Sequence, residues 1–559
     1  MHRRFCFFII PIVFAFTAQA QNLEGIGKQK PFTFHGSITD NLILVHSIGL
    51  PDQSQPFSNI ISGNFNASVY GLSLPFSFTL SNKQRDYSQP FNQFGLSPSY
   101  KWITIHAGYR NVRFSNFTLS GHTFAGVGIE LNPGKFRFGF VSGRFNRSTS
   151  TNQYNPTIDS LPEYKRKGTA IKLGVGSNNS YMDLVLLRIQ DDTASLKSNS
   201  GDYPNRTPEQ NLVTGLNTRI ALSKSLTFEG EGAVSFYTSN LYAARIGSSD
   251  SSLFQKLSKL ILVNQSTLWY TAVRTSLNYK RKGFTTRLEF QRIDPGYKSL
   301  GAYYFNSDIE NFTLSPSFSI WKRKIQLHGS IGLQRDNLRN TKKATTVRKI
   351  GSLALSFNPS RVFGMDAFYS NFNTNQKAGR LPVTDTTKVF QANQTFSLTP
   401  RLTFMNSSRT QMILLVLNRT HLTDNNPSTQ NLIENTASTV NLNYMLSLVA
   451  SKISLTAGLT YLEMKNALFE NKTRGITAGI SRSFANETLY LNLCNSFLFS
   501  NYAQTSGKII NTSLGVNFHL KKHHQFRMNT YFTGNYYPSG SSIHSSKQIK
   551  GDVGYSFTF

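Results

Sequence analysis

The chain has 559 residues, with 59 Lys and Arg against 28 Asp and Glu, and a formal net charge of +31. Only 16% of its residues are charged, whereas 44 Phe and 24 Tyr stand beside a negative mean hydropathy. This mixture argues against an ordinary exported enzyme. It suits strands that are apolar on one side and wet on the other.

Residues 1–20 have the form of a secretory signal peptide. Two arginines precede an apolar stretch over residues 5–16, and Ala18-Gln19-Ala20 is a small-x-small cleavage site. A membrane anchor is the weaker alternative, because a spanning helix needs about 20 apolar residues and Pro11 interrupts this stretch. The sequence therefore predicts export through the Sec pathway.

The mature chain begins with a short tail. We expect residues 21–31 to be periplasmic and residues 32–559 to form one membrane domain, because strand-like alternation starts by Thr33. A TonB-dependent receptor would carry a plug domain ahead of its barrel, and the absence of room for one weighs against TonB-coupled uptake. With Cys494 as the one cysteine left, no intramolecular disulfide or thiolate metal cluster is expected.

Alternation of apolar and polar residues continues through the mature chain in segments of roughly ten residues, the length of a transmembrane strand. Clear examples are residues 325–333, 440–448, 453–461 and 489–499. The longest unbroken apolar run, Met412–Leu417, is far shorter than the about 20 residues of a spanning helix. In a membrane such strands must satisfy their backbone groups by closing into a barrel, which leaves no free edge in hydrocarbon.

The last strand places Val553, Tyr555, Phe557 and Phe559 on one face, with small or polar residues between them. Tyr555, Phe557 and Phe559 resemble the C-terminal signal that the barrel-insertion machinery recognises in bacterial outer-membrane barrels. With its Asn- and Tyr-rich strands, the chain is similar to large porin-like outer-membrane barrels of the Bacteroidota, without matching a named transporter family. The resemblance implies an integral outer-membrane location in contact with membrane lipid and lipopolysaccharide.

Connections between the segments alternate between short and long. A periplasmic C-terminus makes the short ones periplasmic turns and the long ones extracellular loops; the long ones include residues 465–472, 501–507 and 537–546. The predicted fold is all-β: a single transmembrane antiparallel up-and-down β-barrel of about 24 strands, within roughly 22 to 26, an even number being required. The count is ambiguous where residues 60–81 form one strand or two, and where residues 111–119 form a loop or a strand.

Two local sequences stand out. Residues 90–98, rich in Pro, Gly and Phe, are predicted to fold inward as a constriction, with a structured turn as the alternative. Leu253, Leu257, Leu260 and Ile261 have helical spacing, which indicates a short helix in an outward loop or, equally, an extended start of the next strand.

Charged residues at the polar positions of the strands are predicted to line the lumen. If the lumen is open, their excess of positive charge favours anions; alternatively, Arg and Glu on neighbouring strands pair as internal struts. The predicted lumen-lining residues are Arg137, Lys172, Arg219, Glu229, Glu231, Arg274, Arg287, Glu289 and Arg527.

Several of the short turns are strongly basic. They would attract lipid phosphates or an acidic partner, although solvated turns that simply end strands are the plainer interpretation. The basic periplasmic turns are Lys280, Arg281 and Lys282; Lys322, Arg323 and Lys324; and Lys521 and Lys522.

Evidence for enzymatic or metal chemistry is weak. Hydrolysis would need a Ser-His pair with an orienting residue, and only Asn111 with His106, Ser120 and His122 approaches this composition. His519, His523 and His524 have no local carboxylate and fit a basic turn better than a metal site. No enzyme activity, metal or cofactor is predicted, and export excludes nucleic acid as the partner of the basic chain.

Two functions follow from these patterns. The first is a passive channel for small polar or anionic solutes. The second is a non-conducting barrel that serves as a subunit or scaffold of an envelope assembly or secretion complex and contacts envelope proteins through its basic turns and long loops. A barrel of more than sixteen strands leaves a channel unless something plugs it, which favours the first.

Overall fold

The computed structural model describes residues 31–49, 56–82, 92–149, 162–196, 206–246, 257–302, 306–380, 388–502, 505–539 and 542–559. The predicted signal peptide, residues 1–20, and nearly all of the predicted tail lie outside the described residues. In the described part of the chain, no helix is long and apolar enough to span a membrane.

Almost every described residue outside the connections belongs to one antiparallel sheet. Two short helical elements accompany it, α2 (Gln430–Ile433) and the 3₁₀ turn η2 (Ala485–Glu487). The strands are β1 (Phe32–Ile48), β2 (Phe57–Val69), β3 (Leu72–Ser81), β4 (Gln93–Leu96), β5 (Ser99–Tyr100), β6 (Ile103–Asn111), β7 (Thr123–Leu131), β8 (Phe136–Asn146), β9 (Arg166–Gly176), β10 (Tyr181–Asp191), β11 (Gln210–Ala221), β12 (Leu226–Thr238), β13 (Thr267–Arg281), β14 (Phe284–Ile293), β15 (Ile309–Ile320), β16 (Ile325–Arg335), β17 (Ala344–Phe357), β18 (Phe363–Ala378), β19 (Phe390–Met405), β20 (Arg409–Asp424), β21 (Asn435–Leu448), β22 (Ile453–Asn466), β23 (Glu470–Phe484), β24 (Leu489–Tyr502), β25 (Thr505–Leu520), β26 (His524–Ser539) and β27 (Ser542–Thr558).

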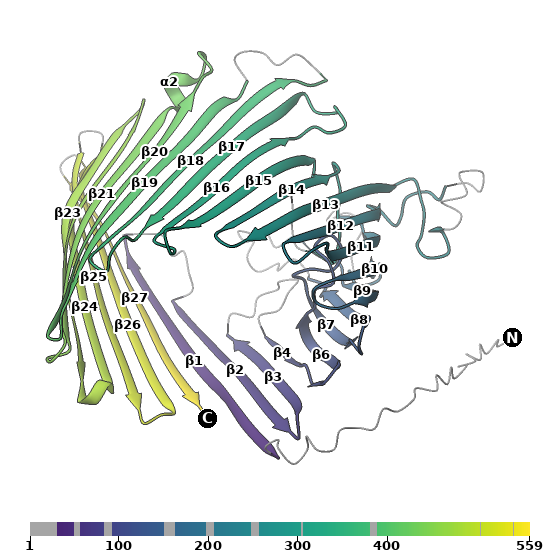
Figure 1. The fold of residues 1–559 in the computed structure, drawn as a ribbon, viewed down its shortest axis with the longest axis horizontal. Helices are drawn as coiled ribbons and strands as arrows, with labels where there is room; N and C mark the ends of the chain where they lie inside the picture. Colours follow the sequence, from purple (N-terminus) through teal and green to yellow (C-terminus); the bar gives the residue numbers. More distant parts are fainter. Residues whose placement is uncertain are drawn as a thin grey trace.

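The sheet closes on itself. Each strand pairs with its sequence neighbours, and β27 returns to pair with β1 (Figure 1). β4 and β5 lie in line between β3 and β6 and act as one interrupted strand, so the ring holds 26 strands. The predicted all-β, antiparallel, up-and-down barrel is confirmed.

The predicted number of about 24 strands is too low, although 26 lies within the expected range. One of the two ambiguous places contributes to the difference. Residues 60–81 form two strands, because Tyr70 and Gly71 adopt positive φ angles of 46° and 87° and turn the chain between β2 and β3. Of residues 90–98, which we expected to fold inward, Gln93–Leu96 form wall strand β4 instead, and β5 follows at Ser99–Tyr100. The other ambiguous place, residues 111–119, contains no strand after Asn111, where β6 ends.

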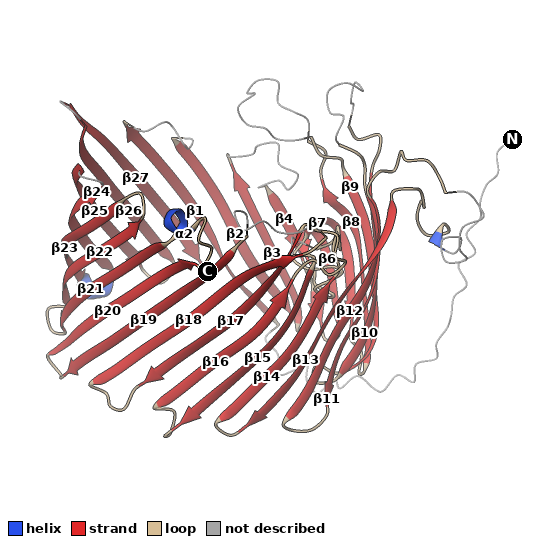
Figure 2. Ribbon diagram, turned by 90° about the horizontal axis from the view of Figure 1, so that it is seen from above, coloured by secondary structure: helices blue, strands red, loops and turns tan. Residues whose placement is uncertain are grey.

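Side chains alternate between the two faces of the wall. On the outer face large apolar residues are exposed, among them Leu184, Ile331, Leu459 and Phe497. In Figure 2 the strands run obliquely across the wall. The outer face therefore has the apolar character of a surface that contacts lipid.

The connections differ between the two edges of the ring. At the edge that holds the C-terminus they are short: β13 ends at Arg281 and β14 begins at Phe284. At the other edge, in the N-terminal half, they are long, as between β14 and β15. Near the C-terminus the expected long loops 465–472, 501–507 and 537–546 are largely absent, because β22 to β27 continue as strands into these segments.

Part of the connection between β12 and β13 packs on the outer face. The Ile261 amide donates to the Leu257 carbonyl over 3.0 Å, which makes a single helical turn, and both side chains pack against Leu212 of β11. The expected helical spacing is thus present from Leu257 onward, and Leu253 lies outside the described residues.

The seam between β27 and β1 is built from both backbone and aromatic contacts. The Phe559 amide donates to the Gly36 carbonyl and the Gly36 amide to the Phe559 carbonyl, each over 3.1 Å. The Phe559 ring stacks on Phe34 at 4.8 Å and on Phe65 at 5.7 Å between ring centroids. Phe65 in turn stacks on Phe76, so the aromatic column extends from β27 to β3.

Replacing Phe559 by Ala should weaken this seam. Two stacked ring pairs are lost, each worth about 0.5 to 1.5 kcal/mol, so the folded barrel should lose about 2 kcal/mol of stability. Urea unfolding of the refolded protein, followed by heat-modifiable gel mobility, measures the effect. The matched control is Phe499→Ala, which removes an outward ring exposed by 52%; equal losses in the two variants would contradict a special role of Phe559.

Candidate functional site

One segment of the chain folds into the barrel rather than away from it. Residues 112–121, which connect β6 to β7, are buried throughout most of their length, with Val112, Phe114, Phe117 and Leu119 at most 4% exposed. The constriction expected at residues 90–98 is therefore supplied by a segment some twenty positions later. We call residues 112–121 the inner segment.

A second connection supports the inner segment. Residues 294–302, between β14 and β15, lie against it: the Tyr297 hydroxyl donates to the Phe117 carbonyl over 2.7 Å, and the Ser299 hydroxyl donates to the Thr118 carbonyl over 2.6 Å. The Ser120 amide also donates to the Gly301 carbonyl over 3.1 Å. We call residues 294–302 the support segment.

The wall makes room for these two segments with small inner-face residues. A side chain at Gly139 of β8 would meet the Phe114 ring at 2.7 Å, and one at Gly215 of β11 would meet Thr118 at 2.7 Å. Around them Val185, Leu187 and Ile189 of β10 face inward and are fully buried. One side of the barrel interior is consequently a hydrophobic core and not a water-filled space.

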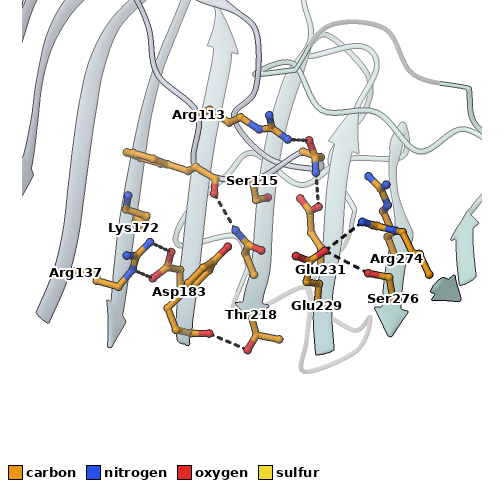
Figure 3. Close-up of a pocket in the computed structure, with 16 residues that line it drawn as sticks. Arg113, Ser115, Arg137, Lys172, Asp183, Thr218, Glu229, Glu231, Arg274 and Ser276 are labelled. Atoms are coloured by element: carbon orange, nitrogen blue, oxygen red, sulfur yellow. Dashed lines mark hydrogen bonds and ion pairs between the residues drawn. The ribbon is translucent and has the colours of Figure 1, made fainter. Parts of the chain in front are cut away.

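Below the inner segment the core gives way to a polar pocket (Figure 3). Arg113 and Asn116 approach it from the inner segment, and the Asn116 amide donates to Glu231 of β12 over 2.7 Å. The Phe117 backbone amide donates to the other Glu231 oxygen over 3.0 Å. Glu231 thus anchors the inner segment to the wall through two hydrogen bonds.

The predicted lumen residues gather around this pocket. Six of them line it. Arg219 and Glu289 do not line it but form ion pairs with the lining residues Glu229 and Arg274, and Arg527 lies elsewhere, on β26. The six lining residues are Arg137, Lys172, Glu229, Glu231, Arg274 and Arg287.

On the β8 to β10 side of the pocket, each predicted cation has a carboxylate partner. Arg137 donates two hydrogen bonds to Asp183, at 2.7 and 2.9 Å, and Asp183 is 1% exposed. The Lys172 ammonium lies 3.1 Å from Glu130 and 4.8 Å from the centroid of the Phe114 ring. Sequence analysis missed both carboxylates, although each falls on the inward parity of its strand.

On the β12 to β14 side, the predicted residues pair with one another. Glu289 lies 2.9 Å from Arg274 and 2.7 Å from Arg287, and Glu229 lies 3.4 Å from Arg287 and 3.8 Å from Arg219. Arg and Glu on neighbouring strands therefore act here as internal struts, the second of the two arrangements expected from the sequence.

The far side of the ring is different. On β26 the inward residues Gln525, Arg527 and Tyr531 are exposed, Tyr531 by 46%. Arg527 lies 3.3 Å from Asp552 of β27. Lys550 shares the inward face of β27 with Asp552 and has no ion-pair partner among the described residues.

The remaining predicted residues lie along the C-terminal edge of the ring. Of the predicted basic turns, Lys280 and Arg281 are the last residues of strand β13 itself, because their pairing with β14 continues to Phe284, and Lys282 alone lies in the turn. The other two turns follow β15 and β25. Trp321, Lys322 and Arg323 adopt positive φ angles, and the Lys324 ammonium lies over the Trp321 ring at 4.8 Å. Lys521 also has a positive φ, of 56°. Tyr555 and Phe557 face outward beside His524, whose Nδ1 lies 2.8 Å from the Tyr555 hydroxyl.

The histidines do not form a catalytic or metal arrangement with the residues singled out from the sequence. His106 lies 3.0 Å from the Ser97 hydroxyl and 3.3 Å from Glu130, whereas Ser120 bonds to the support segment. His122 contacts the Thr123 carbonyl. Within the described ranges, no group of three His, Cys, Asp or Glu side chains is placed to hold a metal ion.

No family model and no curated protein sequence matches this chain. Among solved structures, OccAB2 of Acinetobacter baumannii is similar, with 10% identity over 68% of this chain and 98% of that chain and a TM-score of 0.33. The translocation pore of the P pilus usher PapC has 9% identity over 94% and 99% and a TM-score of 0.39. An anion-selective porin from Comamonas acidovorans has 12% identity over 62% and 100% and a TM-score of 0.26. All three TM-scores are low, so these similarities carry no weight for function.

Replacing Glu231 by Ala should release the inner segment from the wall. Two hydrogen bonds to a charged acceptor disappear, each worth about 1.5 to 3 kcal/mol, and the donors on Asn116 and Phe117 lose their partner. Hydrogen exchange of the Phe117 amide should then speed up by tenfold or more, since about 1.4 kcal/mol corresponds to a factor of ten.

Glu310→Ala is the matched control, because Glu310 pairs with Arg292 and Arg335 on the outer face, away from the inner segment. Exchange at Phe117 that stays at the wild-type rate in Glu231→Ala would show that the apolar contacts and the hydrogen bonds to the support segment hold the inner segment without Glu231.

Proposed function

We propose that the chain is an integral outer-membrane protein that acts as a passive channel for small polar or anionic solutes. The proposal rests on one contrast. The inner face of β10 is buried under the inner segment, whereas inward residues of β26 are exposed. A barrel of this size has an interior far wider than its own side chains can fill, and the described inward segments occupy only one side of it.

The inner segment sets the width of the passage in this proposal. It narrows the lumen from the side of β8 to β12, where the wall cations Arg137 and Lys172 are already paired with the wall carboxylates Asp183 and Glu130. Solutes therefore pass along the opposite wall, which is lined by the neutral polar residues of β21 to β26. Such a lining favours small polar solutes over apolar ones.

A preference for anions rests on two inward cations that lie on β27 and β17, on either side of that wall. Among the described residues, Lys550 has no carboxylate partner, and Arg348 of β17 contacts only the neutral Gln334, over 3.3 Å. Arg527 and Arg401 are matched by Asp552 and Asp366. The remaining excess of positive charge is modest, so we expect weak rather than strict anion selectivity.

The proposed outer-membrane location also implies roles for the signal peptide, the C-terminal aromatic residues and the basic turns. Residues 1–20 would be removed after Sec export, Tyr555, Phe557 and Phe559 would address the barrel-insertion machinery, and the edge with the basic turns would face the periplasm. A non-conducting barrel that serves as a subunit or scaffold of an envelope complex is the alternative, in which those basic turns would contact an acidic partner.

Conductance of the refolded full chain in a planar bilayer tests the proposal. Steady single-channel steps that grow in proportion to salt concentration are expected, because the passage is a water-filled path and not a set of binding sites. A folded, heat-modifiable barrel that stays electrically silent would contradict the channel and favour the scaffold.

The selectivity has its own test in the double variant Arg348→Glu/Lys550→Glu. Charge reversal at these two inner positions should move the reversal potential in a KCl gradient towards cation preference, with conductance nearly unchanged. Arg474→Glu is the control, because Arg474 pairs in register with Tyr461 and Phe499 on the outer face. An unchanged reversal potential in the double variant would refute the assignment of these two residues to the passage.

A further inference from the structure

A second cluster of cations lies on the outside of the barrel, near the ends of β8, β9 and β10 that are far from the C-terminal edge. Strand register brings Arg144 beside Lys167, and Arg188 beside Thr169. Ser142 and Gln190 complete a shallow pocket with these four residues. All six have the same parity as the exposed apolar residues of their strands, so they belong to the outer face.

The side chains of this pocket are arranged to receive an anion. The hydroxyls of Ser142 and Thr169, which both line it, lie 3.1 Å apart. Arg144 donates a hydrogen bond over 2.8 Å to the Tyr109 hydroxyl of β6, so its guanidinium extends across β7 at one side of the pocket. The lining contains three cations and no carboxylate. Guanidinium, ammonium and hydroxyl groups together are the donors that bind phosphate.

The cations are only partly neutralised. Lys167 lies 3.1 Å from Asp192, but its side chain is 60% exposed and keeps free donors. Arg188 has no carboxylate partner among the described residues. Three positive charges that line one pocket attract an anion.

The surface beside the pocket is apolar on the same three strands. Leu186 and Leu184 of β10 and Leu173 and Val175 of β9 follow the pocket towards the C-terminal edge, and they are 36%, 54%, 48% and 56% exposed. A ligand with a phosphate head and hydrocarbon tails matches this succession. A small soluble phosphate would use only the head site.

We propose that Arg144, Lys167 and Arg188, with the Ser142 and Thr169 hydroxyls, form a binding site for the phosphate of a lipid headgroup in the outer leaflet. The lipid tails lie along the apolar residues of β9 and β10. This inference rests on the proposed outer-membrane location, with the long-loop edge outward, and is independent of whether the lumen conducts.

Other outward cations are arranged differently. Arg292 and Arg335 flank Glu310 at 3.0 and 2.7 Å on β14 to β16, so a carboxylate already occupies the place that a phosphate would take. This pair serves as the matched control, because its double replacement removes two outward cations, as the Lys167→Gln/Arg188→Gln replacement does.

The test uses the folded full chain in detergent and measures binding of bisphosphorylated lipid A by native mass spectrometry. The Lys167→Gln/Arg188→Gln variant should bind about thirtyfold more weakly, because each cation at a membrane surface contributes about 1 kcal/mol. The Arg292→Gln/Arg335→Gln variant should bind like the wild type. Dephosphorylated lipid should bind the wild type and the Lys167→Gln/Arg188→Gln variant equally weakly.

Equal binding of lipid A by the two double variants would overturn the site while leaving the channel proposal intact, because conductance of the same preparations is measured separately. Inorganic phosphate that binds the wild type as tightly as lipid A would overturn the assignment to a lipid. A chain that folds only without detergent would overturn the site together with the proposed location.

Discussion

Pairing of backbone groups between strands is the constraint on which the structure depends. Each N–H and C=O in a hydrocarbon environment has to find a partner within the protein, and a sheet can meet this demand only if its first and last strands meet. Here the meeting point is the pair of hydrogen bonds between Gly36 and Phe559. The C-terminal residue therefore has two roles: it completes the ladder, and its ring joins the aromatic column on the outer face.

The barrel architecture could be predicted because the alternation of apolar and polar residues is visible within each strand's own sequence. Each strand shows its two faces in its own ten or so residues, and closure follows from the lack of any other apolar element. Strand number is harder to predict, since it depends on turns. The chain reverses at Tyr70 and Gly71 without proline or any run of polar residues, so residues 60–81 read equally well as one long strand, and the count was too low.

The interior could be predicted only in part. The alternation of side chains along each strand was enough to place Arg137, Lys172 and Glu231 inside the barrel. That they line one pocket is known only from the structure. The inner segment could not be foreseen, since Val112, Phe114, Phe117 and Leu119 look like an irregular apolar stretch that could be a strand or a loop. They are covered by the segment that contains Tyr297 and Ser299, about 180 residues later in the chain. A local sequence pattern gives no information on contacts between residues so far apart. One signal of the inner segment was present in the sequence. Val185, Leu187 and Ile189 are apolar residues on the inward face of β10, where a strand that borders a water-filled lumen would carry polar residues.

The bridge between Phe117 and Tyr297 also bears on the outline of the molecule. It ties the connection after β6 to the connection after β14 across the interior, so the strands between them must bend around a fixed chord. Figure 1 shows this part of the ring, β6 to β12, curled more tightly than the broad sweep of β15 to β27. The interior is therefore divided unevenly: the lobe inside β6 to β12 is filled by the inner and support segments, whereas the inward residues Gln525, Arg527 and Tyr531 on β26 are exposed.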